Sequence, residues 1–382
     1  MVDLPSEIIY DVFSRIPIKT LFRFRSACKL WRDYIDDPYL AINHAKQTPD
    51  EPIPIMFIYH PKLPRILRFL HINESKEGNN SLESKKNLVM EFWCNESLSR
   101  HSWIAVHGSC NGLLYLSHDH LHGTALVVIH PLRKECYELP PINIALHKDS
   151  RESCGLGFDA STNTFKMVCV LLRKEIWSEN LDKVRKNLRT MVHVLGTDSW
   201  REIPQVPSYP INGEPVFSHG YLYWVSANLF PWPTGDRRKV ICYDVRKEEF
   251  GLIDPPKETS RSRTCPTDTR LVDLHGEVGY VVHRIGQSME VWVLKLKEWV
   301  IYCRFDQKPP CPRGEMSVLG HWNKNGDILL TNTRGSETRL FVYSRESGVI
   351  REIDLVGGED ERGEYIRMYQ SGLFTIHGNN AN

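Results

Sequence analysis

The apolar positions of residues 4–35 recur with a helical period. A first stripe, with members four residues apart and two further apolar side chains that widen it, consists of Leu4, Ile8, Val12, Ile16, Ile9 and Phe13. Pro17 ends this pattern, because proline lacks a helical N–H and clashes with the preceding turn. A second stripe, spaced by three and four, follows at Leu21, Phe24, Cys28, Trp31 and Ile35. The pattern predicts two amphipathic helical segments separated by a proline break.

These helices need a surface to cover them. A unit of about 40 residues buries too little apolar area to fold without a staple or a partner. Periodicity alone cannot tell whether the covering surface belongs to the same chain or to another protein. The helices are therefore either a cap packed on the rest of the chain or a docking unit for a permanent partner, and a docking unit is favoured.

From Ile55 onward the period changes to that of short strands separated by Gly, Pro, Asn and Asp, which is typical of an all-β fold. A unit of two hairpins recurs about every 50 residues, in the range of kelch repeats. The second hairpins of five such units are ALVVIHPLRKECYEL, TMVHVLGTDSWREI, KVICYDVRKEEFGLI, MEVWVLKLKEWVIYC and RLFVYSRESGVIREI. Residues 53–107 have room for a sixth unit, and YIRMYQSGLFTI offers a strand that closes the ring, which removes exposed sheet edges. We predict a kelch-like β-propeller with six blades.

The stretch LPSEIIYDVFSRIPIKTLFRFRSACKLWRDYIDDPYL resembles an F-box of the plant type. The resemblance rests on the Leu4-Pro5 opening, the Ile16-Pro17 break and Trp31-Arg32, and it runs through most of residues 3–40. Residues 105–355 resemble the plant F-box-associated domain in the phrases GSCNGLLYLS, GLGFDASTNTFKMV, VLGTDSWREIP, VFSHGYLYWVS and VICYDVRKEEFGLI. There are two departures: His130-Pro131 stands where Asn-Pro is usual, and residues 53–107 carry no clear family signature. The expected domains are an F-box at 1–45 and a propeller at 46–382.

The resemblance implies a non-catalytic receptor of an SCF-type ubiquitin ligase. F-box helices dock on a Skp-type adaptor, which links them to a cullin and its RING subunit, while the propeller recruits a protein target for ubiquitination and proteasomal degradation. The positions that the resemblance assigns to the adaptor contact are Leu4, Pro5, Ile8, Ile9, Val12, Ile16, Pro17 and Leu21. Trp31 fits the inner packing of the helices equally well.

Target recognition is expected in the longer loops between strands, since loops carry variable contacts on a fixed scaffold. These candidate loops are 177–187, 227–238, 255–268 and 308–315. Aromatic and arginine side chains dominate protein interfaces. Within the loops these are Trp177, Phe230, Trp232, Arg237, Arg238, Arg261 and Arg263.

Composition narrows the class of protein. The net charge of +1 gives no electrostatic reason to expect nucleic acid or membrane binding. No two of the ten cysteines stand in a C-x-x-C arrangement, so no zinc site is indicated and most should be reduced core thiols. The chain carries no apolar run long enough to span a bilayer and no recognisable leader, so we expect a cytosolic or nuclear protein.

Three sequence motifs that could indicate an enzyme have simpler structural explanations. GLGFDA satisfies G-x-G-x-x-A, but a second strand, rather than a helix, is expected to follow it. HDHLH could present imidazoles to a metal, yet it falls at a predicted hairpin tip. Cys110 has no evident base beside it. We therefore expect no catalytic residue, no metal and no cofactor.

Three functions remain open at this stage. The favoured one is a substrate-recruiting ligase subunit, the second is a non-degradative scaffold, and the third is a propeller enzyme with a cluster of acid or base groups at its central channel. The sequence does not identify the target, the propeller face that binds it, or its fate.

Overall fold

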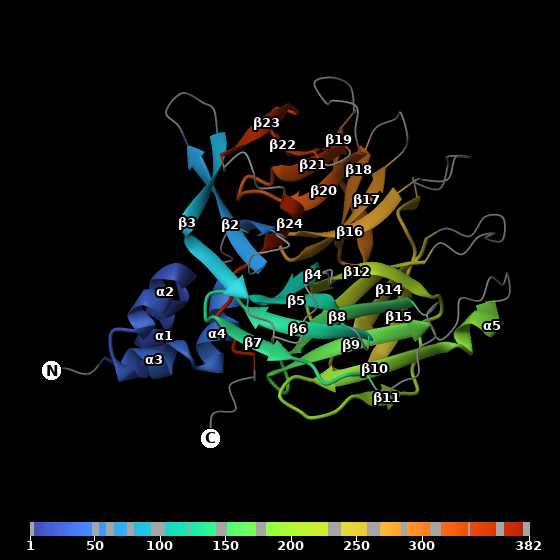
Figure 1. Ribbon diagram of the computed structural model, residues 1–382, viewed down its shortest axis with the longest axis horizontal. Coiled ribbons are helices and arrows are strands. Elements are labelled where there is room, and N and C mark those ends of the chain that lie inside the picture. The colour runs from blue at the N-terminus through green and yellow to red at the C-terminus, as the bar shows by residue number, and fades with distance from the viewer. Residues whose placement is uncertain are drawn as a thin grey trace.

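We describe the fold from a computed structural model. It describes residues 4–47, 53–58, 65–74, 80–92, 104–120, 123–142, 151–172, 181–227, 238–257, 268–283, 289–305, 315–334, 337–356 and 363–376. Four helices come first and lie together at one side of the strands (Figure 1). No helix within these ranges is both long and apolar enough to cross a membrane.

The helical unit has more helices than the sequence pattern predicts. Its members are α1 (Ser6–Ser14), α2 (Ile18–Arg25), α3 (Lys29–Ile35) and α4 (Pro38–Gln47). Pro5 and Pro17 occupy the N-cap positions of α1 and α2, where their fixed φ is compatible with a helix start. The second predicted segment is split in two, because Cys28 is extended and its sulfur accepts a hydrogen bond from the Trp31 N–H at 3.5 Å. Helix α4 was not predicted from the sequence.

Four antiparallel sheets of four strands each follow the predicted hairpins. They are β4 (Ile104–Cys110), β5 (Leu113–His120), β6 (Gly123–His130) and β7 (Glu135–Glu138); β8 (Arg151–Asp159), β9 (Thr164–Leu172), β10 (Leu188–Val194) and β11 (Arg201–Ile203); β12 (Ile211–Ser218), β13 (Tyr221–Ser226), β14 (Val240–Asp244) and β15 (Glu249–Ile253); and β16 (Asp268–Leu274), β17 (Glu277–His283), β18 (Met289–Lys295) and β19 (Glu298–Phe305). A short helix, α5 (Leu181–Arg185), precedes β10.

The remaining strands form one sheet of eight. They are β20 (Glu315–His321), β21 (Ile328–Arg334), β22 (Glu337–Tyr343), β23 (Ile350–Val356), β24 (Gly363–Tyr369), β1 (Ile53–Ile58), β2 (Arg65–Glu74) and β3 (Asn80–Phe92). Their order is β20-β21-β22-β23-β3-β2-β1-β24. The predicted count of six blades is not confirmed, because the described strands form five sheets. The merger arises from a parallel pairing of β23 with β3 over 354–356 and 81–83.

The inner strands of the ring are the edge strands β4, β8, β12, β16, β20 and β24, and Figure 1 shows β4, β12, β16 and β24 near one another in its middle. Each inner strand contacts the next one around the ring, in the order β4, β8, β12, β16, β20 and β24, and β24 contacts β4. The strand at the chain's end, β24, pairs with β1. The C-terminal strand therefore closes the ring, as its sequence predicts.

Helices and ring share one core. The largest cluster of buried side chains combines Phe13, Ile18, Leu21, Ile35 and Leu40 of the helical unit with residues of β4–β10 and of the segment after β24. One side of the helical unit is thus covered by the chain's own ring.

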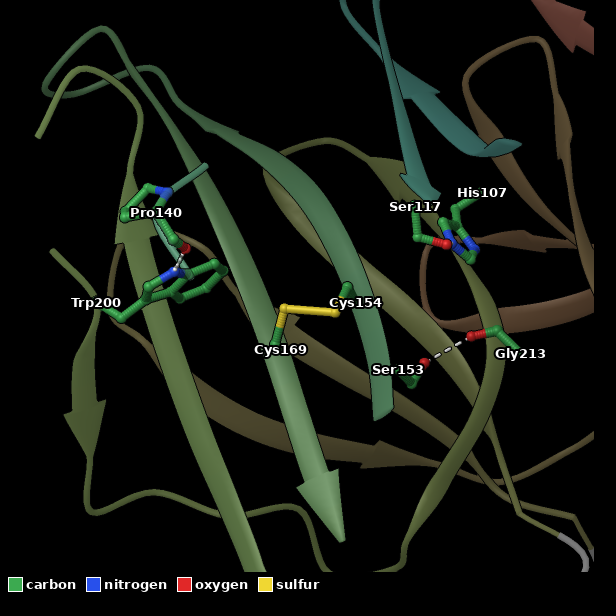
Figure 2. The surroundings of a disulfide bond; sticks show 8 residues. All are labelled: His107, Ser117, Pro140, Ser153, Cys154, Cys169, Trp200 and Gly213. Atoms are coloured by element: carbon green, nitrogen blue, oxygen red, sulfur yellow. Dashed lines mark hydrogen bonds between the residues drawn. A yellow bond between two sulfur atoms is a disulfide. The ribbon is translucent and has the colours of Figure 1, made fainter. Parts of the chain in front are cut away.

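Cys154 and Cys169 form a disulfide between β8 and β9, where they are directly opposed in the ladder (Figure 2). Their Cα atoms are 4.2 Å apart. This bond was not predicted from the sequence, because most cysteines were expected to be reduced. The free cysteines of the described part are Cys28, Cys110, Cys136, Cys242 and Cys303.

The turn glycines differ sharply in their surroundings. Gly112 and Gly220 have φ values of 89° and 82°, which an L side chain adopts at a cost. A Cβ on Gly112 would lie 2.5 Å from the backbone of Gly372, whereas a Cβ on Gly220 would meet nothing within 4 Å. The first position is where the β4–β5 turn meets the segment that follows β24.

We expect Gly112→Ala to destabilise the protein more than Gly220→Ala. The φ penalty of about 1 kcal/mol is common to both, and overpacking against Gly372 adds about 1–3 kcal/mol at Gly112 alone. Thermal unfolding of the two variants beside the wild type measures the difference. Equal losses would show that the backbone at Gly372 moves aside freely.

Candidate functional site

An apolar stripe on α1 faces away from the core. Leu4, Ile8 and Val12 are 60%, 47% and 48% exposed, and they lie one above the next because they are four residues apart. Phe13, on the other side of the helix, is buried. The helix thus carries two apolar faces, and the chain itself covers only one of them.

The other residues predicted for the adaptor contact divide by exposure. Pro5 and Pro17 are exposed, while Ile9 and Ile16 are half-buried against the shared core. Leu21 has no exposed surface at all. The structure contradicts its assignment to an open contact: the side of α2 that carries Leu21 packs into the shared core of helices and ring.

Aromatic side chains pack the helices of the N-terminal unit against one another. The ring of Trp31 lies 5.9 Å from that of Phe13 and 5.0 Å from that of Phe24. Trp31 therefore contributes to the packing of the helices on one another. Two exposed apolar residues of the helical unit, Leu30 in α3 and Tyr39 in α4, were not predicted, because their helices were not recognised as separate.

A cavity of about 490 Å³ lies between the helices and the middle of the ring. Its helical wall includes Ala41 and His44, and its ring wall is made by the carboxyl ends of β4, β12 and β16 with the segment after β24. Asp273 lines it, and burial raises the pKa of this carboxyl to about 6 although the Gly276 N–H donates to it. The carboxyl ends of these inner strands therefore converge on the side that faces the helices.

The strand ends that precede two of the predicted target loops lie on the opposite side of the ring. Leu172, at the end of β9, pairs with Arg151, and Ser226, at the end of β13, pairs with Ile211; Arg151 and Ile211 are the first residues of inner strands. These strand ends therefore lie away from the cavity. Six of the predicted target residues, Trp177, Phe230, Trp232, Arg237, Arg261 and Arg263, lie outside the described residues.

Arg238 is the one predicted target residue whose contacts are described. Its guanidinium donates to the Thr269 carbonyl at 3.2 Å, and its own carbonyl accepts from the Tyr280 hydroxyl. The side chain is half-buried. It therefore bridges the third and fourth sheets at the start of β14.

The enzyme-like signals have structural explanations where they can be placed. GLGFDA ends β8 and is followed by a turn and β9, so no helix N-terminus is present there for a pyrophosphate. Burial raises the pKa of the Cys110 thiol well above its usual value, which disfavours the reactive thiolate. Of the three histidines in HDHLH, His118 and His120 lie in β5 and His122 is outside the described residues. Within the described ranges no group of three or more His, Cys, Asp or Glu side chains is arranged to hold a metal.

The described chain thus combines an N-terminal helical unit that carries an exposed apolar stripe with a β-propeller. Residues 1–43 match the family model of the F-box domain, and residues 55–377 match that of the F-box associated beta propeller domain. The chain belongs to this family of F-box proteins, whose members are substrate receptors of the SCF type.

Relatives from Arabidopsis thaliana agree with this assignment. The chain is 28% identical to F-box protein At3g07870 over 306 residues, which cover 76% of this chain and 69% of that protein. It is 24% identical to F-box/kelch-repeat protein At3g23880, with coverage of 77% and 76%. A third relative, F-box protein At1g30790, is 23% identical and the match covers 97% of this chain and 93% of that one.

Proposed function

We propose that this protein is the substrate-recognition subunit of an SCF-type E3 ubiquitin ligase. In this proposal the F-box binds a Skp-type adaptor, and through it a cullin and a RING subunit, while the propeller binds a protein target that is then ubiquitinated and degraded. The chain itself makes and breaks no bonds. It raises the effective concentration of a target lysine near the ubiquitin-loaded enzyme.

The exposed stripe of Leu4, Ile8 and Val12 carries this proposal. Burying one such side chain contributes about 1.5–3 kcal/mol, so three left in water are a substantial unused binding energy. The ring covers the opposite side of the helices through Phe13, Ile18 and Leu21. The stripe is therefore available to a foreign subunit without unfolding the protein.

Target binding is proposed for the side of the ring away from the cavity. The loops that contain Trp177, Phe230, Trp232, Arg237, Arg261 and Arg263 leave the strands there, and Arg238 stands at the end of one of them. In this proposal the target-binding and adaptor-binding surfaces lie on different sides of the propeller. A large target then does not collide with the adaptor.

We further infer six radial units in the ring, with the eight-stranded sheet counted as two. Six inner strands follow one another in a closed circle of contacts. The strands β24, β1, β2 and β3 repeat the four-strand order of the other sheets.

We place the boundary between the two domains at residues 45 and 46. We also place the protein in the cytosol, the nucleus or both, where ubiquitin ligases of this type act.

Affinity purification from the source tissue with the proteasome blocked tests the proposed function. The full-length chain is expected to retain the adaptor, the cullin and one or more further proteins whose levels rise during the block. A version with Ile8→Asp is expected to retain the further proteins without the adaptor. If the partners' levels do not change with the block, the protein is a scaffold, and if the wild type retains no adaptor, the proposal fails.

A further inference from the structure

The helical unit is attached to the ring through a buried arginine. Arg133 lies in the turn between β6 and β7, and its side chain is only 3% exposed. One of its terminal nitrogens lies 2.9 Å from a carboxylate oxygen of Asp36, the residue that ends α3. The other donates to the Leu373 carbonyl at 2.9 Å, in the segment that follows β24. One side chain thus connects three parts of the chain that are far apart in sequence.

The helical side of this attachment is itself rigid. Arg25, at the end of α2, forms two parallel hydrogen bonds of 2.7 Å to the two oxygens of Asp36. Burial alone would raise the pKa of Asp36, but the hydrogen bonds and charges of Arg25 and Arg133 outweigh it and lower the pKa. Paired guanidinium–carboxylate contacts of this geometry define orientation as well as energy.

An aromatic contact accompanies the ion pair. The guanidinium carbon of Arg133 lies 5.4 Å from the centre of the Phe22 ring in α2, and the same ring packs at nearly a right angle to that of His130, with the ring centres 5.8 Å apart. The side chain of His130 is fully buried, and its ring nitrogen Nδ1 accepts a hydrogen bond from the backbone N–H of Arg133 at 3.3 Å. The turn that carries Arg133 is therefore held in place by the residue that replaces the family's usual asparagine.

The cavity makes this attachment more important. Ala41 and His44 of α4 line the cavity, and Ala41 also belongs to the core that helices and ring share. The cavity leaves part of this side of the helices without close packing against the ring. The orientation of the helices therefore depends on the shared core together with the contacts of Arg133, Asp36 and Phe22.

We infer that Arg133 is a positioning residue that holds the adaptor-binding helices at a fixed angle to the propeller. The importance of this angle for ubiquitin transfer rests on the proposed function. The inference that Arg133 fixes the angle does not. A ligase subunit acts by placing a lysine within reach of a distant enzyme, so an angular error at the joint is magnified across the whole assembly. Loss of this side chain should leave both binding surfaces intact and change only their relative orientation.

Arg133→Met is the discriminating variant. Methionine retains apolar contact with Phe22, and Asp36 keeps its two bonds to Arg25, so the helices have no unpaired carboxylate that would unfold them. Arg189→Met is the matched control, because Arg189 pairs with Glu202 at 2.8 Å within a single sheet. Arg133→Lys keeps the charge but can replace only one of the two terminal nitrogens.

The distance between labels placed at Asp33 in α3 and at Leu296 in the β18–β19 turn, both exposed, measures the angle in the full chain alone. We expect one narrow distribution for the wild type and for Arg189→Met, a broad or displaced one for Arg133→Met, and partial recovery for Arg133→Lys. An unchanged distribution in Arg133→Met overturns the inference, whether or not the adaptor binds.

The consequence for transfer is measured with the reconstituted ligase by self-ubiquitination. We expect Arg133→Met to bind the adaptor with unchanged affinity, to lower the rate of transfer by about tenfold, and to spread ubiquitin over more of the ring's lysines. An unchanged rate and an unchanged set of lysines would show that the angle does not matter for transfer. Loss of adaptor binding in the wild type would instead contradict the proposed function.

Discussion

Ile8→Asp is expected to weaken binding of the Skp-type adaptor by roughly 100-fold or more, about 3 kcal/mol, because a carboxylate would be buried without a partner in an apolar contact. Ile8 is 47% exposed in the free chain, so the substitution should change the free energy of unfolding little. Titration calorimetry with purified adaptor measures the loss. Combining it with Pro5→Ala, at the N-cap of α1, should abolish co-purification of the adaptor.

Leu252→Asp is the matched control for this experiment. Leu252 lies in the outer strand β15 and is 46% exposed, so the same charge is introduced at an equally open apolar position of the propeller. It should leave adaptor affinity unchanged. Wild-type affinity in Ile8→Asp and in the double variant would remove the stripe of α1 from the adaptor contact and with it the main support for the ligase proposal.

The sequence predicts the helices and strands more accurately than it predicts which of their side chains are exposed. Leu4, Ile8, Val12 and Leu21 belong to one kind of helical pattern, yet three are open and the fourth is fully buried. Periodicity identifies an apolar face but does not say what covers it, because the covering surface comes from strands more than 80 residues away. The same limit hid the link between Asp36 and Arg133, whose sequence neighbours give no sign of the pairing.

The strands were predictable where their turns are chemically specific. Asn111-Gly112, His219-Gly220 and His275-Gly276 all have positive φ at both positions, which is the signature of tight hairpins and is visible in the glycines alone. The pairing of β23 with β3 has no such signature, since it joins residues about 270 positions apart through three backbone pairs. A repeat in the sequence therefore indicates how many hairpin units there are, but not how many separate sheets they form.

The largest effect on stability is expected at Lys166. This side chain, 9% exposed, lies 3.0 Å from carboxylate oxygens of both Asp159 and Glu248, and donates to the Val245 carbonyl at 2.9 Å. Asp159 belongs to the second sheet, whereas Val245 and Glu248 belong to the turn between β14 and β15, so the ammonium group joins two neighbouring sheets. Removing the cation leaves Asp159 buried with less compensation.

Lys166→Met should lower the free energy of unfolding by about 3–5 kcal/mol, the usual cost of breaking a buried ion pair from one side. Arg189→Met breaks an exposed pair in the same sheet and should cost about 1 kcal/mol or less. Denaturant unfolding of the full chain compares them. Similar losses would mean that the Lys166 cluster contributes no more than a surface pair.

The loss of stability at low pH gives a second test of the cluster around Lys166. Burial by itself raises the pKa of Asp159, but hydrogen bonds from Ser161 and Lys166 and the charge of Lys166 outweigh it and lower the pKa to about 2. The unfolded value is about 3.9, so this carboxylate contributes its full stabilisation above about pH 4 and loses it as the pH falls through 2. In Lys166→Met the folded pKa rises toward the unfolded one, and the decline in stability between pH 4 and 2 should become shallower than in the wild type. An equally steep decline would show that Lys166 does not determine the ionisation of Asp159, and the ion pair between these two residues would then make no contribution to stability at low pH.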